Sequence, residues 1–326
     1  MYDLIIVGAG PCGIAAAVEA QRRGLSYLVL EQSSVCASLT KYPTYMTFAS
    51  TPENLELGGH PFPTGGEKPT RLEAIRYFRR VAEVEQIQVH QHEKVVAVQR
   101  DDAGGYRLHS RRRDGGQAAY EARNVAIAIG YFDHPNMLGI PGEENPERCT
   151  HFYSEPSPYY GMDVAVVGGK NSAVEAALQL YRAGVKVSLV YRKAELPPSV
   201  KPWVRPDIEA RINSAAIPAY FSTQLAAINP TSITLERDGQ RFDLPNDYVF
   251  LLTGYSPDQT ILRQLGVEID GATGKPHYDE ATMETNVPGL FLVGVIAAGY
   301  DANKIFIENG RFHGKAVVDA ILARRP

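Results

Sequence analysis

Three closely spaced glycines near the N-terminus form the first pattern in this chain that could bind a ligand. Gly8, Gly10 and Gly13 make a G-x-G-x-x-G motif between an apolar run (Leu4 to Val7) and a helix-favouring run that begins at Ile14. The first glycine permits a tight turn, the second lets a pyrophosphate approach the backbone, and the third lets the helix pack close to the strand. Because a helix N-terminus attracts negative charge, the spacing predicts a strand, a turn and a helix around the phosphates of a dinucleotide.

Two further residues bear on the chemistry of this turn. Glu31 follows the next apolar run, Tyr27 to Leu30, where its carboxylate would accept hydrogen bonds from ribose hydroxyls. Cys12 lies inside the turn, where a helix N-terminus favours a thiolate but a bound pyrophosphate would oppose it. Three interpretations of Cys12 stay open: a nucleophile toward a disulfide, a redox relay, or a small residue that fits beneath the dinucleotide.

The opening pattern returns in the second half of the chain. The run Asp163 to Val167 leads into a second glycine motif, Gly168 to Ala173, and then into a helix that is predicted to continue through Tyr181. Each half goes on with a helix, a three-strand meander and an apolar strand that ends in Gly130 or Gly254. This internal repeat, at an offset of about 160 residues, predicts two nucleotide sites.

Alternating and apolar patterns predict the strands in more detail. The first half should contain strands at 93–100, 106–113 and 117–121 and a separate apolar strand at 124–129. The second half should contain strands at 186–191 and 247–252, with a meander within 224–244. An apolar strand at 290–294 and a helix from about residue 303 would be most stable if they returned to the first sheet. The prediction is an α/β chain of two Rossmann-like, three-layer (ββα) dinucleotide-binding domains, comprising residues 1–131 with 255–326 and residues 132–254.

The stretch from Gln32 to Pro69 is too long for an ordinary connector and is rich in aromatic residues. We expect it to form an ordered cover over a bound ring system, and the alternative is an excursion that plugs the core. A capping box at Thr70 and Glu73 then opens a helix. That helix is predicted to carry one apolar stripe, made of Leu72, Ile75, Phe78 and Val81.

The two nucleotide sites should differ in their ligand. Glu31 ends the second strand of the first half, whereas Tyr191-Arg192-Lys193 ends its counterpart. A carboxylate repels a 2′-phosphate, and Arg192 with Lys193 would neutralise one. The first site is therefore predicted to hold FAD, with the long aromatic stretch over its ring, and the second to hold NADPH. The alternative for Arg192 and Lys193 is an exposed strand end, and Lys170 stands where a second glycine would be expected.

Composition narrows the function classes. The chain has 326 residues, is 44% apolar and 21% charged, and carries a net charge of -4, which gives no reason to expect nucleic acid or an anionic membrane as a partner. The three cysteines show no C-x-x-C spacing and the eight histidines form no ligand cluster, so no metal is predicted. With the first strand at residue 2 or 3 and no apolar run of membrane length, we expect no signal peptide, no membrane span and a cytoplasmic location.

In combination, the motifs resemble one family of flavoproteins. The blocks that carry the resemblance are Gly8 to Gly13, Tyr42-Pro43-Thr44, Gly168 to Ala173, Lys201-Pro202-Trp203, Ile296 to Asn303 and Ile305 to Gly310. They are similar to those of the bacillithiol disulfide reductases, also called bacilliredoxin reductases, which are thioredoxin reductase-like proteins. The resemblance spans nearly the whole chain.

The resemblance implies an FAD-containing enzyme that uses NADPH to reduce bacillithiol disulfide or a bacillithiolated bacilliredoxin, with Cys12 as the active thiol. It also makes a homodimer or homotetramer the expected assembly. The wider superfamily places an Asp after its last strand on the flavin ribitol. Since Gly294 is followed by Val295 here, that contact must come from elsewhere, and Asp301 is the candidate.

The motifs and the resemblance together imply a set of contacts to each cofactor. Those to FAD are Gly8, Gly10, Pro11, Cys12, Gly13, Glu31, Gln32, Lys41, Tyr42, Val95, Gly130, Gly294, Asp301 and Ile305. Those to NADPH are Gly169, Lys170, Asn171, Ser172, Arg192, Lys193 and Gly254.

Three other functions stay open at this point. A flavin monooxygenase would share the two glycine motifs, but its F-x-G-x-x-x-H linker signature is not met around His151. An NADPH-ferredoxin reductase of the same fold would pass single electrons to an acidic partner. A redox-sensing protein would bind FAD and NADPH without useful turnover. The absence of C-x-x-C argues against thioredoxin reduction by the route that thioredoxin reductases use.

Overall fold

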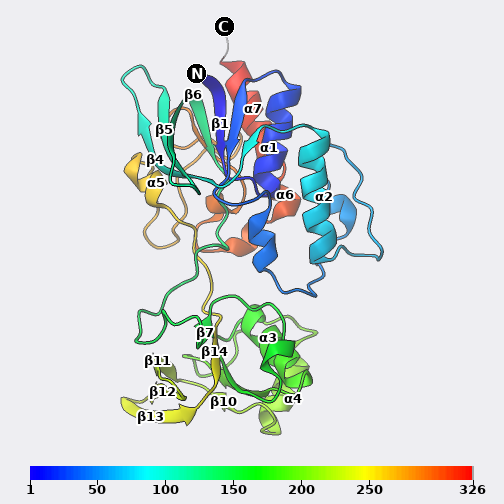
Figure 1. Cartoon of the computed structure of the whole chain (residues 1–326), viewed down its shortest axis with the longest axis vertical. Coiled ribbons are helices and arrows are strands. Elements are labelled where there is room, and N and C mark those ends of the chain that lie inside the picture. The colour runs from blue at the N-terminus through cyan, green and yellow to red at the C-terminus, as the bar shows by residue number, and fades with distance from the viewer. Residues whose placement is uncertain (325–326) are drawn as a thin grey trace. The chain divides into compact units, whose positions relative to one another are not determined.

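The computed structural model describes residues 1–324, which form two compact units (Figure 1). The first unit comprises Met1–Thr40, Met46–His134 and the chain from Tyr255 onward, and the second comprises Lys41–Tyr45 and Pro135–Gly254. The short segment Lys41–Tyr45 thus leaves the first unit and returns to it.

The first unit is built on a seven-stranded sheet with the order β3-β2-β1-β6-β5-β4, in which β15 also pairs with β6. Its strands are β1 (Tyr2–Val7), β2 (Tyr27–Leu30), β3 (Val89–His90), β4 (Glu93–Arg100), β5 (Tyr106–Arg112), β6 (Gln117–Ile127) and β15 (Leu290–Leu292). The neighbours β1, β2 and β3 are parallel, whereas β4, β5 and β6 form an antiparallel meander. The tail strand β15 lies parallel to β6 and completes this sheet from the far end of the chain.

Helices cover the first unit. They are α1 (Pro11–Arg22), α2 (Arg71–Val84), α5 (Thr260–Gln264), α6 (Ile307–Gly310) and α7 (His313–Ala323). Short 3₁₀ turns lie at Ala37–Lys41, Pro52–Asn54, Val295–Ala298 and Ala302–Lys304. Figure 1 shows α7 beside α1, and a Cβ placed on Gly314 would lie 2.3 Å from the Cα of Ala16. The two helices therefore meet backbone to backbone, which a side chain at position 314 would prevent.

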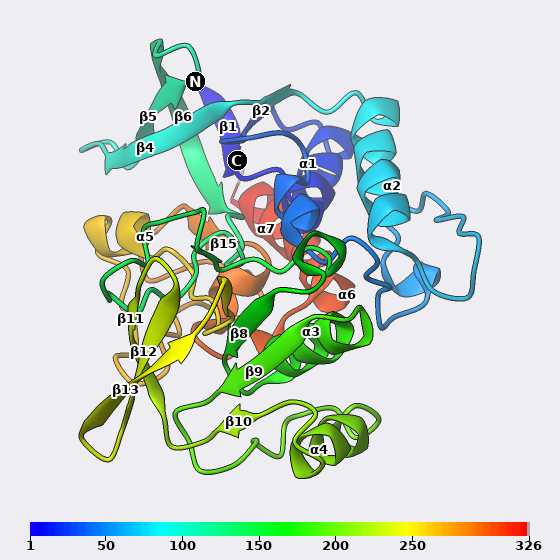
Figure 2. The same cartoon turned by 60° about the horizontal axis from the view of Figure 1, so that its bottom comes forward.

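The second unit has a five-stranded parallel sheet, β10-β9-β8-β14-β7, and a separate antiparallel sheet, β11-β12-β13 (Figure 2). Its strands are β7 (Cys149–Thr150), β8 (Asp163–Val167), β9 (Lys186–Val190), β10 (Ala219–Tyr220), β11 (Gln224–Ile228), β12 (Ser232–Arg237), β13 (Gln240–Pro245) and β14 (Tyr248–Leu251). Its helices are α3 (Asn171–Arg182), α4 (Arg205–Asn213) and a 3₁₀ turn at Ser157–Tyr159.

Two apolar cores divide the second unit into three layers. One core joins the parallel sheet to α3 and α4, through residues such as Val166, Leu180 and Ile208. The other joins the opposite face of that sheet to β11 and β12, through residues such as Ala165, Leu225 and Leu235. This arrangement confirms the predicted α/β class with a β-meander in each half.

Hydrogen bonds show how closely the two halves repeat. The N–H of Gly8 donates to the carbonyl oxygen of Leu30 at 2.8 Å, and the N–H of Gly168 donates to that of Val190 at 2.9 Å. Positions separated by about 160 residues therefore occupy the same place in each glycine turn, and Tyr191 is the counterpart of Glu31.

Three predicted details are wrong. The strands expected at 117–121 and 124–129 are one strand, β6, because Ala122 is buried and pairs with both Tyr2 and Tyr106, so no break occurs there. The tail helix begins at His313 rather than near residue 303, after short turns that end at Gly310. Leu72 is 50% exposed and does not belong to the apolar stripe of α2, although the capping box of Thr70 is present.

Candidate nucleotide-binding sites

The glycines of the first turn serve different purposes. A Cβ on Gly8, whose φ is 108°, would lie 2.5 Å from the carbonyl oxygen of Ala128, and a Cβ on Gly13 would lie 2.1 Å from that of Gly8. Both glycines are required by the protein's own packing. In contrast, Gly10 has an ordinary φ of -71° and nothing within 4 Å of its Cβ position. Since no side chain caps α1 at Gly10, this open space before the helix N-terminus fits a pyrophosphate.

Glu31 lies where the sequence places it, at the end of β2 and beside the turn. One carboxylate oxygen accepts the N–H of Ala9 at 2.8 Å and the other accepts the N–H of Ser33 at 2.8 Å. Burial raises the pKa of Glu31 above its ordinary value, and these two hydrogen bonds oppose that effect. Because each oxygen has further acceptor capacity, the carboxylate can also receive ribose hydroxyls.

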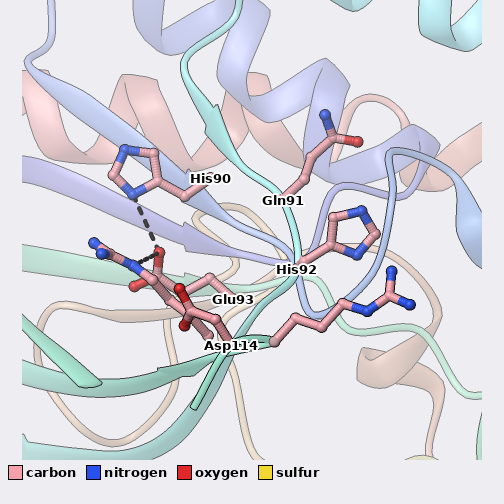
Figure 3. Close-up of a pocket in the computed structure, with 7 residues that line it drawn as sticks. His90, Gln91, His92, Glu93 and Asp114 are labelled. Atoms are coloured by element: carbon pink, nitrogen blue, oxygen red, sulfur yellow. Dashed lines mark hydrogen bonds and ion pairs between the residues drawn. The ribbon is translucent and has the colours of Figure 1, made fainter. Parts of the chain in front are cut away.

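A depression with a volume of about 620 Å³ adjoins this end of the sheet (Figure 3). Its lining consists of His90, Gln91, His92, Glu93, Arg112, Arg113 and Asp114. It lies next to Glu31, because the N–H of Glu93 donates to the carbonyl oxygen of Glu31 at 2.8 Å. Its position at the carboxyl ends of β2 and β3 is the edge where parallel sheets bind nucleotides.

The buried Glu93 carboxylate holds the wall of this depression together. It accepts hydrogen bonds from the hydroxyls of Ser110 at 2.5 Å and Tyr120 at 2.9 Å and from the guanidinium of Arg112 at 3.3 Å. Figure 3 also shows its contact with His90, at 3.5 Å. Burial disfavours the charged form, but these partners outweigh burial and lower the pKa of Glu93. Val95, two residues further along β4, is buried.

Cys12 faces the end of β15 and the short helix α6. A Cβ on Gly294 would lie 3.2 Å from its Sγ, and a Cβ on Gly310 would lie 2.9 Å from it, so two glycines make room for the thiol. Burial, reinforced by the carboxylate of Glu308, raises the pKa of Cys12 to about 12. Desolvation and this carboxylate thus oppose the thiolate that the helix N-terminus would favour. Ile305 packs at the same place, 3.4 Å from the Cβ position of Gly310.

Two residues around this thiol were not anticipated from the sequence. Nδ1 of His313 accepts the N–H of Gly294 at 3.1 Å, and burial lowers the pKa of His313. Cys36, with a φ of 57°, donates its N–H to the carbonyl oxygen of Ala9 at 3.0 Å and so supports the turn from behind. A cysteine with a positive φ has no sequence signature. His313 belongs to the C-terminal segment, which contacts the glycine turn only in the folded chain.

Three other expected FAD contacts lie at distinct places. Asp301 is exposed and its carboxylate accepts the N–H of Asn303 within its own 3₁₀ turn. Gln32 is exposed beside Glu31. Gly130 follows β6 with a φ of 69°. Contact of Asp301 with a flavin ribitol stays a prediction.

Lys41 and Tyr42, also expected at the FAD, belong to the second unit. Nζ of Lys41 lies 4.8 Å from the ring centroid of Phe152, and the N–H of Thr44 donates to the carbonyl oxygen of Ser154 at 2.8 Å. Elsewhere in the long aromatic stretch, Phe62 is buried, with its ring stacked 4.0 Å from that of Tyr77. The burial of Phe62 agrees with the alternative interpretation, in which this stretch fills the core.

The second glycine turn repeats the first with a different ligand surface. A Cβ on Gly168, whose φ is 144°, would lie 2.4 Å from the carbonyl oxygen of Leu252, so this glycine is again required by packing. Lys170 precedes α3 with an ordinary φ of -96° and an exposed side chain. Ser172 is also exposed, and Asn171 accepts the N–H of Lys201 at 2.9 Å, which ties the Lys201-Pro202-Trp203 loop to the turn. Gly254 follows β14, where its carbonyl oxygen accepts the N–H of Asn136 at 2.9 Å.

Charge distinguishes the two sites most clearly. Thr223 is the counterpart of Glu93, because its N–H donates to the carbonyl oxygen of Tyr191 at 3.1 Å, as that of Glu93 does to Glu31. Arg237 donates to the hydroxyl of Thr223 at 2.9 Å, where Arg112 donates to a carboxylate. The second site thus has neither of the two carboxylates of the first.

It also carries added cations. Arg192 and Lys193 take the places of Gln32 and Ser33, and both are exposed. Within residues 1–324, no ion pair engages either side chain. This edge of the second unit is suited to an anion such as a 2′-phosphate.

Other features of the described residues concern metals, disulfides and membranes. Among residues 1–324, no group of three or more His, Cys, Asp or Glu side chains is placed to hold a metal ion. Cys12, Cys36 and Cys149 are free thiols. None of the helices in the described part of the chain is long and apolar enough to cross a membrane.

Comparison with known proteins identifies relatives of this chain in sequence and in structure. The profile of a family described as pyridine nucleotide-disulphide oxidoreductase matches residues 5–294. A bacilliredoxin reductase, Bdr, of Bacillus subtilis is 42% identical over 322 residues, which cover 98% of this chain and 97% of that protein. The structure of a bacillithiol disulfide reductase, Bdr (YpdA), from Bacillus cereus superposes with a TM-score of 0.95 at 42% identity and covers 99% of both chains.

A more distant structure bears on the fold alone. The thioredoxin reductase of T. acidophilum is 21% identical and superposes with a TM-score of 0.73, covering 99% of this chain and 98% of its own. The predicted thioredoxin reductase-like fold is confirmed by this similarity.

Proposed function

The chain belongs to the pyridine nucleotide-disulphide oxidoreductase family, and we propose that it uses NADPH and FAD to reduce bacillithiol disulfide or a bacilliredoxin that carries bacillithiol. It is an enzyme of this family, with FAD and NADPH as its cofactors. The acceptor is proposed from the relatives named bacilliredoxin reductase and bacillithiol disulfide reductase.

One observation carries the assignment of the cofactors to their sites. Two glycine turns with the same backbone hydrogen bonds differ in charge, with Glu31 in the first and Arg192 with Lys193 in the second. The first turn suits a dinucleotide with free ribose hydroxyls, which is FAD, and the second suits the 2′-phosphate of NADPH. We propose the first compact unit as the FAD domain and the second as the NADPH domain, with the contacts expected from the sequence.

Cys12 is the proposed redox thiol. FAD, when bound, supplies the two-electron chemistry that links NADPH to a disulfide. In the proposed step, the sulfur of Cys12 attacks one sulfur of the substrate as the Cys12 thiol gives up its proton, the S–S bond breaks, one thiol leaves with that proton, and a mixed disulfide with Cys12 remains. Two electrons and two protons then restore the Cys12 thiol and release the second thiol, so that one NADPH yields two thiols.

A Cys12→Ala variant tests this role. It should retain FAD and NADPH-driven bleaching of the flavin but lose disulfide reduction by about 100-fold or more. The matched control is Cys149→Ala, since Cys149 is a buried thiol of the second unit whose Sγ contacts the carbonyl oxygen of Glu143 at 3.2 Å. Full turnover by Cys12→Ala would assign Cys12 to the alternative role of a small residue that fits the turn.

The function itself is tested by NADPH oxidation with different acceptors. Bacillithiol disulfide should give two thiols per NADPH, with lower rates for glutathione disulfide, cystine and oxygen. Faster reduction of a ferredoxin would favour the ferredoxin reductase alternative, and oxygen consumption that exceeds disulfide reduction would favour a monooxygenase-like oxidase. Bleaching of the flavin without turnover of any acceptor would favour a redox-sensing role.

The cofactor assignment has its own test. Arg192→Ala should raise the KM for NADPH by about 10-fold while leaving that for NADH within about 2-fold, because only NADPH carries the 2′-phosphate. Equal changes for the two nucleotides would remove Arg192 from the phosphate site.

The proposal also covers the oligomeric state of the protein and its location in the cell. The resemblance supports a homodimer or homotetramer, which light scattering on the purified protein would measure. Three free thiols support a reducing compartment, the cytoplasm.

A further inference from the structure

An aromatic ring lies directly on the second glycine turn. A Cβ on Gly169 would lie 2.6 Å from Cδ1, Cδ2 and Cε1 of Tyr191, so the ring face covers the Cα of this glycine. Gly169 does not have a positive φ, and its backbone would accept an alanine. The ring of Tyr191, which is only 8% exposed, is therefore the reason that glycine is required at this position.

The first glycine turn has different residues at the two equivalent positions. Ala9 is the counterpart of Gly169, and its N–H donates to a carboxylate oxygen of Glu31, the counterpart of Tyr191, at 2.8 Å. Alanine thus accompanies a carboxylate in one turn and glycine accompanies a ring in the other. The two positions therefore form a pair in each turn, and an alanine at position 169 would exclude the ring of Tyr191.

We infer that Tyr191, seated on Gly169, is a positioning residue that makes the second site selective for nucleotides with a 2′-phosphate. This inference rests on the proposed function, in which the second site binds NADPH. The ring occupies the place from which a carboxylate would reach the ribose, and it brings no charge that repels a phosphate. Because the packed ring fixes residue 191, the first side chains free to reach the 2′ position are those of Arg192 and Lys193, both exposed.

The test exchanges the two pairs. Titration calorimetry on the FAD-loaded full chain would compare adenosine 2′,5′-bisphosphate with 5′-AMP, which differ in the 2′-phosphate. Gly169→Ala, which forces the ring away, should reduce the preference for the bisphosphate over 5′-AMP, measured as the ratio of their dissociation constants, about 10-fold. The double variant Gly169→Ala/Tyr191→Glu recreates the pair of the first turn and should reduce the preference for the bisphosphate about 100-fold. Tyr191→Phe retains the ring and should match the wild type.

The ratio of the two dissociation constants distinguishes a positioning role of Tyr191 from a purely structural one. A general loss of structure would weaken the binding of both ligands alike. Tyr191→Glu with Gly169 retained places a smaller side chain there without a clash and keeps the test valid if the double variant does not fold. A wild-type preference for the bisphosphate that survives in Gly169→Ala and Tyr191→Glu would overturn the inference alone. No preference in the wild type would overturn the proposed NADPH site and the inference together.

Discussion

At the scale of single residues, the glycines of the first turn separate demands of the fold from demands of a ligand. Gly8 and Gly13 are required because carbonyl oxygens of the protein lie less than 3 Å from their Cβ positions. Gly10 meets nothing within 4 Å, and its backbone is one that alanine adopts. The sequence motif predicts this division of roles, and the structure adds that no atom of the protein itself requires glycine at position 10.

Gly10→Ala should therefore fold but bind FAD poorly. The apo-protein should lose no more than about 1 kcal/mol of unfolding free energy, the usual difference between glycine and alanine at a helix N-cap. FAD affinity should fall at least about 10-fold, because the methyl group occupies the space through which a pyrophosphate approaches. Thermal unfolding of the apo-protein and titration with FAD measure the two effects. Gly13→Ala is the contrasting variant, expected to lose about 1–3 kcal/mol through overpacking. Undiminished FAD binding by Gly10→Ala would place the pyrophosphate elsewhere.

Cys12 illustrates what a motif cannot reveal at this scale. Its position at a helix N-terminus favours a thiolate and a bound pyrophosphate opposes one. The Glu308 carboxylate, which raises the pKa of Cys12, lies in a tail almost 300 residues away in sequence. The position of the thiol could be predicted, but its protonation could not, because desolvation depends on which segments fold over it.

The raised pKa of Cys12 gives a measurable reactivity. At pH 8, the peptide that contains Cys12 should react with iodoacetamide about 30-fold or more slowly than a free cysteine, whose pKa is about 8.5. The rate should increase toward pH 12, the region of its pKa. Peptide mapping by mass spectrometry measures the rate, and Cys12→Ala identifies the modified peptide. A rate within about 3-fold of free cysteine at pH 8 would contradict the raised pKa of Cys12.

At the scale of secondary-structure elements, the capping box of α2 and the apolar strands could be predicted because they depend on neighbours in sequence. The continuity of β6 could not, since it depends on Ala122 pairing with strands on both sides. The second unit differs at the equivalent point of its meander. There, Asn246 and Asp247 separate β13 from β14, so the same prediction of two strands holds.

Glu93 links the three strands of the first meander. Its carboxylate, at the start of β4, accepts hydrogen bonds from Ser110 and Arg112 of β5 and from Tyr120 of β6. Glu93→Gln should lower the free energy of unfolding by about 1–3 kcal/mol, because charged hydrogen bonds are lost in a buried place. The control is Glu121→Gln on β6, whose exposed pair with Arg107 should contribute less than about 1 kcal/mol.

The same carboxylate predicts a dependence on pH. The pKa of Glu93 is lower in the folded state than the unfolded value of about 4.3, so the unfolded state takes up the proton first. The stabilisation is complete above about pH 4.3 and is lost as the pH falls through the lower folded pKa. Urea unfolding between pH 3 and 7 should show the wild type and Glu93→Gln converging at the acid end. A constant difference across this range would contradict the assignment.

At the scale of the whole molecule, chain order and spatial units do not coincide. The first unit needs β15 and α7 from the tail, and β15 pairs with β6 across more than 160 residues. The second unit is nearly continuous, with only Lys41–Tyr45 contributed from outside Pro135–Gly254. The internal repeat could be read from the sequence, because each half carries its own motif and strands. The departure of Lys41–Tyr45 could not, because it depends on contacts such as that between Thr44 and Ser154.

This organisation predicts that the second unit folds on its own. A fragment of residues 135–254 retains both of its cores and loses the contacts made by Lys41–Tyr45, among them the Thr44–Ser154 hydrogen bond, which contributes about 1 kcal/mol. It should unfold cooperatively in urea and bind adenosine 2′,5′-bisphosphate within about 10-fold of the full chain, and Arg192→Ala in the fragment should weaken that binding. By contrast, a chain that ends at residue 254 lacks β15 and α7 and should retain no FAD, because the sheet and α1 of its first unit are left uncovered. A fragment that unfolds without cooperativity, or a truncated chain that keeps its FAD, would show that the two units depend on one another in a different way.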